Sequence, residues 1–117
     1  MPALRLLHAA ALAALLPALA GAAPPRAASA PAKGRALAVA IEDMRFSPAT
    51  LQVRPGDRVT WTNRDLVPHT VTARDGRFDS RTLAAGASFT WVVATGKGPV
   101  DYACVYHPTM VARLVLP

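Results

Sequence analysis

Three side chains that bind soft metal ions lie within seven residues near the C-terminus of this 117-residue chain. They are Cys104, His107 and Met110, in a Cys-x2-His-x2-Met spacing, and the imidazole of His69 lies 35 residues before the cysteine. A thiolate, two imidazoles and a thioether form the donor set of a blue-copper electron-transfer site, in which sulfur suits Cu(I) and imidazole suits both copper states. The spacing therefore predicts a copper centre with these four residues as ligands.

Each donor taken alone has an ordinary explanation. A single cysteine in an exported protein is commonly a buried small hydrophobe or a partner in an intermolecular disulfide. A histidine beside a proline is commonly a loop residue, and Met110 alone would fill the core. Taken together, these explanations require every histidine and cysteine after the N-terminal segment to match the copper pattern by accident. Met44 is different, because it and Phe46 are predicted to be alternating core positions.

The elements that must hold these donors are predicted to be β-strands. Cys104 ends one predicted strand and Val111 begins the next, so one tight loop carries three donors. His69 stands at the start of a further predicted strand. To join the other donors, this start must lie at the same end of the fold as the loop. Short strands separated by turn signals about every ten residues indicate a sandwich or barrel. The predicted strands are 37–41, 51–53, 58–62, 70–72, 88–93, 100–104 and 111–116.

Composition and charge exclude several classes of protein. The single cysteine rules out an internal disulfide and a Cys-rich zinc module. The formal net charge of +6 comes largely from basic residues before Ala36, after which nine basic residues face seven acidic ones. No basic stripe with interleaved aromatic residues remains, so a nucleic-acid partner is not expected.

The N-terminal segment has the pattern of a secretory signal peptide over residues 1–20. Arg5 supplies the positive charge, residues 6–16 are Ala/Leu-rich without a charge, and Ala18-Leu19-Ala20 forms a small-residue cleavage site. The alternative, a membrane anchor, is disfavoured because the apolar run is short. We therefore expect export to the periplasm and no membrane insertion after cleavage. Residues 21–35 are predicted to be a flexible Ala/Pro-rich leader, followed by one domain over 36–117.

The region from Met44 onward resembles the cupredoxins, the type 1 blue-copper proteins, and within them the amicyanin and pseudoazurin group. The matching segments are MRFSPATLQVRPGDRVTWTNRD, VPHTV and DYACVYHPTMVARLVL. The resemblance implies a single-domain, all-β Greek-key β-sandwich with one type 1 copper held by His69, Cys104, His107 and Met110. It also implies a periplasmic one-electron carrier that exchanges electrons with a redox protein such as a c-type cytochrome or a periplasmic dehydrogenase.

Three positions depart from the family pattern. Val100 stands where an aromatic residue is common, Thr70 where an asparagine follows the first histidine, and Ala112 where a glycine is common. The backbone N–H of Thr70 is still expected to reach the Cys104 sulfur. None of these departures removes a ligand.

Three classes of function remain open. The first is an electron carrier, predicted to be a monomer and not an enzyme, because the copper has no open position and no base lies beside it. The second is a periplasmic copper-binding protein for storage, delivery or sensing. The third is an exported sandwich without a metal that binds a partner through its surface.

Overall fold

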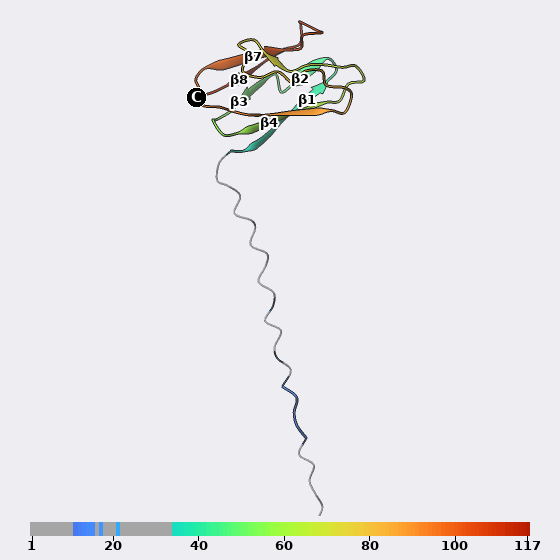
Figure 1. The fold of residues 1–117 in the computed structure, drawn as a ribbon, viewed down its shortest axis with the longest axis vertical. Coiled ribbons are helices and arrows are strands. Elements are labelled where there is room, and N and C mark those ends of the chain that lie inside the picture. Colours follow the sequence, from blue (N-terminus) through green and yellow to red (C-terminus); the bar gives the residue numbers. More distant parts are fainter. Residues whose placement is uncertain (1–10, 16, 18–20, 22–33) are drawn as a thin grey trace, which may run out of the picture.

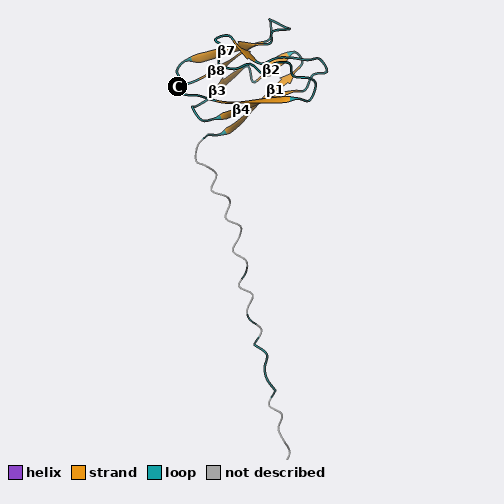
Figure 2. Ribbon diagram, in the orientation of Figure 1, coloured by secondary structure: helices purple, strands orange, loops and turns teal. Residues whose placement is uncertain are grey.

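The computed structural model describes residues 11–15, 17, 21 and 34–117, and within these ranges every regular element is a β-strand (Figures 1 and 2). The predicted signal peptide (1–20) and leader (21–35) therefore lie largely outside the described residues. Among the described residues, none belongs to a helix of the length and hydropathy needed to cross a membrane. The strands are β1 (Ala36–Glu42), β2 (Arg45–Ser47), β3 (Thr50–Gln52), β4 (Arg58–Asn63), β5 (Thr72–Ala73), β6 (Ser88–Val92), β7 (Pro99–Ala103) and β8 (Val111–Val115).

The strands form two four-stranded sheets, with the orders β2-β1-β4-β6 and β3-β8-β7-β5. The pairs β1–β4 and β3–β8 are parallel, and the other neighbouring strands are antiparallel. Figure 1 shows the two sheets as the layers of a sandwich. This arrangement confirms the predicted all-β sandwich fold.

The core between the sheets follows from period-two burial along the strands. In β4, Val59 and Trp61 point inward and are fully buried, and in β7 the inward residues are Val100 and Tyr102. The Trp61 indole N–H donates a hydrogen bond to the Tyr102 hydroxyl at 3.2 Å. The rings of both residues also pack against Phe78, with centroids 5.4 and 5.9 Å away.

The strand register brings the predicted donor segments to one end of the second sheet. Ala103, the last residue of β7, pairs with Thr72 of β5 on one side and with Val111 of β8 on the other. Cys104 follows Ala103 directly, and His69 lies three residues before Thr72. The loop 104–110 and the segment 69–71 must therefore lie at the same pole.

The segment predicted as a strand over 70–72 is regular only from Thr72 onward. The Thr70 N–H donates to the Cys104 sulfur and the Val71 N–H donates to the Ser80 hydroxyl, so neither N–H bonds to a neighbouring strand. Before β5 begins, His69 pairs with Leu83 through a bridge, and the Val71 carbonyl accepts the Ser80 N–H at 2.9 Å. Side-chain acceptors therefore take the place of the expected strand pairing here.

The prediction that Met44 lies in the core is wrong, although Phe46 is buried as expected. Met44 is 41% exposed, because it sits with Asp43 in the turn between β1 and β2, where both residues have positive φ (60° and 53°). The two left-handed residues reverse the chain and turn the Met44 side chain toward solvent. The alternation that includes Phe46 therefore starts only with β2 (Arg45–Ser47), a strand that the sequence did not predict.

Candidate metal centre

Three of the four predicted donors converge at the pole defined above. The ligand atoms of His69, Cys104 and His107 all lie within 4.8 Å of one another. The Cys104 Sγ is 3.8 Å from Nδ1 of His69 and 3.6 Å from Nδ1 of His107. The two imidazole rings lie edge to face, with centroids 5.0 Å apart. Residues far apart in the sequence therefore direct two nitrogens and one sulfur at a common point.

These separations fit donors that share one metal ion. A metal with bonds of about 2.0 Å to nitrogen and about 2.3 Å to sulfur holds such atoms about 3.5–3.7 Å apart when their angle at the metal is about 110–120°. One soft thiolate and two imidazoles form the trigonal donor set that copper takes in electron-transfer sites. The residues present therefore fit a copper ion, and the pairing of Nδ1 with Sγ selects the ring nitrogen that each histidine would use.

Met110, the fourth predicted donor, is buried at the end of the same loop and is 3% exposed. Its backbone N–H donates to the His107 carbonyl at 2.8 Å, and its carbonyl accepts the Cys104 N–H at 3.1 Å. These two bonds close the loop onto itself immediately before β8. The thioether is thus held on a short, internally bonded turn together with the other two donors of the loop.

Thr70 joins the histidine segment to the cysteine loop. Its backbone N–H donates to Cys104 Sγ at 3.3 Å, as predicted, and this dipole favours negative charge on the buried sulfur. Its hydroxyl accepts the Val105 N–H at 2.9 Å and bonds to the Thr72 hydroxyl at 3.0 Å. The threonine side chain is therefore long enough to hold the loop, at the position where the family commonly has asparagine.

Asp65 fixes the far side of the His69 ring. Its carboxylate lies 2.8 Å from His69 Nε2 and also accepts the backbone N–H groups of Asp43 and Met44, at 2.8 and 3.0 Å. Burial raises the pKa of Asp65, but the hydrogen bonds from Met44, His69 and Asp43 outweigh it, so the net pKa is lowered and the carboxylate stays charged. A histidine that donates from Nε2 presents Nδ1 to a metal.

Asn63 holds the segment that carries Asp65 and His69. Its side-chain amide donates to the carbonyls of Val67 and Leu83, both at 2.9 Å, and its side-chain oxygen accepts the Asp65 N–H at 3.0 Å. Neither Asn63 nor Asp65 was predicted as a site residue from the sequence. The available signal was a carboxylate four residues before a predicted histidine ligand, because such ligands commonly donate their second N–H to a carboxylate.

The two histidines differ in exposure. His69 is fully buried, whereas His107 is partly exposed on the loop. Exposed apolar side chains stand next to the donors in sequence, with Leu66 and Val67 before His69 and Val105 and Tyr106 before His107. The partly exposed histidine thus directly follows two exposed apolar residues in the chain.

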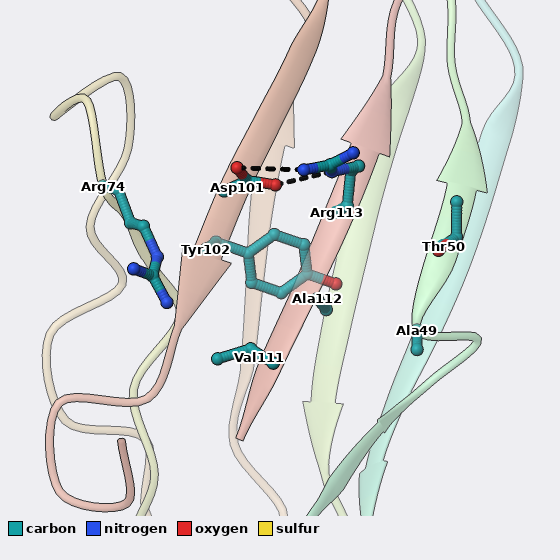
Figure 3. A pocket seen from close by; sticks show the side chains of 8 residues that line it. All are labelled: Ala49, Thr50, Arg74, Asp101, Tyr102, Val111, Ala112 and Arg113. Atoms are coloured by element: carbon teal, nitrogen blue, oxygen red, sulfur yellow. Dashed lines mark hydrogen bonds and ion pairs between the residues drawn. The ribbon is translucent and has the colours of Figure 1, made fainter. Parts of the chain in front are cut away.

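A separate pocket of about 520 Å³ lies on the second sheet and contains none of the four predicted donors (Figure 3). Arg113 of β8 and Asp101 of β7 form an ion pair across it, with 2.6 Å between Nε and Oδ1. The hydrogen bond from Arg113 lowers the pKa of Asp101. The charges of Asp101 and Arg113 offset each other, which leaves Arg74 as the other charged residue of the lining.

A two-sheet sandwich with a Cys-His-Met loop facing a buried histidine defines a cupredoxin. The cupredoxin-like domain family matches residues 8–116, and the chain belongs to this family. Among its members, the chain is close to amicyanin.

Two curated relatives support this placement. Amicyanin from Paracoccus denitrificans is 34% identical over 90 residues, which are 69% of this chain and 65% of that protein. Amicyanin-alpha from Methylorubrum extorquens is 31% identical over 83 residues, which are 67% of this chain and 69% of that protein. The chain thus spans just under two thirds of the first relative.

Solved structures agree with the sequence matches. A Cu(I) structure of an amicyanin variant has a TM-score of 0.64 at 29% identity and covers 70% of this chain and 82% of that one. A purple cupredoxin from Nitrosopumilus maritimus has a TM-score of 0.61 at 28% identity and covers 69% of this chain and 99% of that one. Both matches therefore cover more than two thirds of this chain.

Proposed function

We propose that the chain binds one type 1 copper ion through His69, Cys104, His107 and Met110 and carries single electrons. The observation that carries this proposal is the convergence of two Nδ1 atoms and one Sγ within 4.8 Å in a cupredoxin. When bound, copper supplies a centre that alternates between Cu(II) and Cu(I), and so accepts and releases one electron.

The protein's own part is to hold the donors in one arrangement. Asp65 fixes the His69 ring, Thr70 fixes the sulfur and the loop, and the backbone bonds of Met110 close the loop. Donors held on both sides by hydrogen bonds move little when the charge of the site changes. We propose a carrier rather than an enzyme, because four protein ligands would leave the metal no open position for a substrate.

We further propose that electrons pass to the partner at the partly exposed His107. Leu66, Val67, Val105 and Tyr106 are 94, 42, 58 and 50% exposed and provide apolar contact area beside the donors. A small apolar surface suits a transient redox complex, which buries little area. A c-type cytochrome or a periplasmic dehydrogenase is the proposed partner, the periplasm the proposed location, and a monomer the proposed state, in line with the predicted signal peptide.

The experiment that tests the copper site is titration of the apoprotein with Cu(II). One equivalent should produce an intense thiolate-to-copper charge-transfer band, and Cys104→Ala should abolish it. Zinc must be assayed first, because it competes for imidazole and thiolate donors. A zinc-free protein that takes up one Cu(II) without the band would overturn the proposal.

Copper storage, delivery or sensing is the competing function, and kinetics separate it from electron transfer. A carrier should exchange electrons rapidly with a small redox reagent and release copper slowly to a chelator. A storage or delivery protein should release copper readily to the same chelator. Both rates can be measured on one copper-loaded sample by following the charge-transfer band.

A further inference from the structure

A small surface pocket of about 160 Å³ brings a second methionine to the proposed copper site. Met44, in the turn between β1 and β2, and Met110, on the loop before β8, both line it. Met44 is 41% exposed and Met110 is 3% exposed, so the pocket connects a thioether open to solvent with a thioether that is enclosed. Thr109 and Val111 form part of its wall.

Neither packing nor turn geometry favours a methionine at position 44. The side chain is largely outside the core, and the backbone has a φ of 60°, a conformation disfavoured for residues with a Cβ atom. Asn or Gly would be the ordinary choice in such a turn. Met44 therefore places an apolar thioether on the surface at a position where the fold gains little from it.

The turn that carries Met44 is attached to the metal donors by one side chain. The Asp65 carboxylate accepts the Met44 N–H at 3.0 Å and the Asp43 N–H at 2.8 Å, and the same carboxylate lies 2.8 Å from His69 Nε2. The position of the turn is thus set relative to a proposed copper ligand. Met44 stands at a defined place beside the site rather than on an independent loop.

The chemistry of the pocket suits Cu(I). Thioethers are soft donors that bind Cu(I) and have little affinity for hard ions. The charged residue in the pocket wall is Arg45, which repels cations, so an ion held here depends on the sulfur donors and not on charge. The pocket thus places an exposed methionine beside a buried one whose loop also carries Cys104.

We propose that Met44 is the entry site for Cu(I), a role that rests on the proposed copper function. Met44 binds the incoming ion, which passes through the pocket to Met110 and then to Cys104, His69 and His107. No electron moves in this sequence. Protein donors replace the ligands with which the ion arrives, and the Cys104 thiol releases its proton to solvent as the thiolate binds.

The test compares the uptake of Cu(I) and Cu(II) by the apoprotein and by Met44→Leu, which keeps the apolar volume and removes the sulfur. Cu(I) is supplied as its bathocuproine disulfonate complex, whose absorbance falls as copper is transferred, and Cu(II) uptake is followed by the charge-transfer band. Met44→Leu should slow Cu(I) uptake about tenfold, because a soft ion loses its first donor. The rate of Cu(II) uptake and the final Cu(I) affinity should not change.

Val92→Leu is the control, because Val92 is 56% exposed, has no sulfur and does not line the pocket. It should leave both uptake rates unchanged. Equal Cu(I) uptake by the wild type and Met44→Leu would overturn the entry site, and so would an equal loss of Cu(I) and Cu(II) uptake, which would indicate a change of shape. Failure of the proposed function gives a different result, since the wild type would then bind neither ion at the Cys104 site.

Discussion

Asp65 and His69 are joined by a 2.8 Å contact between Oδ2 and Nε2, and the ring of His69 is completely buried. The contact occupies one ring nitrogen and leaves Nδ1 facing Cys104 Sγ at 3.8 Å. The carboxylate is itself held by two backbone N–H groups from the β1–β2 turn. The orientation of the buried histidine is therefore set by the other sheet of the sandwich.

Removing the Asp65 carboxylate should weaken copper binding without abolishing it. In Asp65→Ala the His69 ring loses the partner that fixes its orientation, and the proposed ligands all remain. Loss of such a partner typically costs about 10–100-fold in metal affinity. Competition with a chelator of known affinity measures the change.

Asp75→Asn is the control for this experiment, because Asp75 is exposed and, among the described residues, pairs with Arg77 and not with a proposed ligand. It should bind copper like the wild type. If Asp65→Ala and Asp75→Asn have the same affinity, Asp65 does not position His69 for the metal.

The Thr70 hydroxyl should slow copper release, because it accepts the Val105 N–H and so holds the loop that carries Cys104 and His107. Thr70→Ala should release copper to a chelator several-fold faster than the wild type. Thr70→Ser keeps the hydroxyl and should restore most of the difference. Equal release rates for the alanine and serine variants would show that the hydroxyl does not hold the loop.

The strands that hold the site could be predicted because each buries one face. Along 58–62 the apolar residues Val59 and Trp61 alternate with polar ones, and both are fully buried in β4. The short strand β2 could not be predicted in this way, since three residues give no measurable period. Likewise, nothing local indicated that the N–H groups of Thr70 and Val71 would bond to side chains instead of a neighbouring strand.

The convergence of His69, Cys104 and His107 was predictable because few other residue types bind soft metals, and the chain has few of them after residue 36. The residues that orient the donors were not predicted. Asp65 acts through a contact with His69 and with the turn at Asp43, and turn geometry depends on φ angles that the residue types there do not favour. Met44 was assigned to the core because the residue types do not reveal the positive φ angles of this turn.

Replacing Met110 by glutamine should keep copper bound and lower its reduction potential. An amide oxygen stabilises Cu(II) relative to Cu(I) when compared with a thioether, and the axial ligand tunes the potential of such sites. Cyclic voltammetry of the wild type and Met110→Gln measures the shift. An unchanged potential would mean that Met110 serves only as a buried apolar side chain.

Acid should destabilise the apoprotein partly through Asp57, which accepts hydrogen bonds from the Arg35 side chain and from the N–H groups of Arg35 and Arg54. The Arg35 hydrogen bond, opposed by burial and assisted by the backbone donors, lowers the pKa of Asp57 to about 2. Because the folded pKa lies below the unfolded one, this stabilisation is present above about pH 4 and is lost as the pH falls through about 2.

Asp57→Asn isolates that contribution, which we expect to be about 1 kcal/mol because Arg35 is half exposed and solvent screens the pair. Urea unfolding at neutral pH and near pH 2 should show a smaller loss of stability for Asp57→Asn than for the wild type. The other carboxylates are unchanged, so they cancel in the comparison. Identical pH dependence in the two proteins would rule out Asp57 as a source of acid sensitivity.

Tyr102→Phe should destabilise the protein by about 1–2 kcal/mol, because it leaves the fully buried Trp61 indole N–H without its acceptor. The ring itself is retained, so its packing against Phe46 and Phe78 is not the variable. Tyr106→Phe is the matched control, since that hydroxyl bonds to Thr82 but the side chain is half exposed and water can replace the lost partner. The free energy of unfolding in urea should fall clearly for Tyr102→Phe and by less than about 0.5 kcal/mol for Tyr106→Phe. Equal effects of the two substitutions would show that the buried Trp61–Tyr102 hydrogen bond contributes no more to stability than one at the surface.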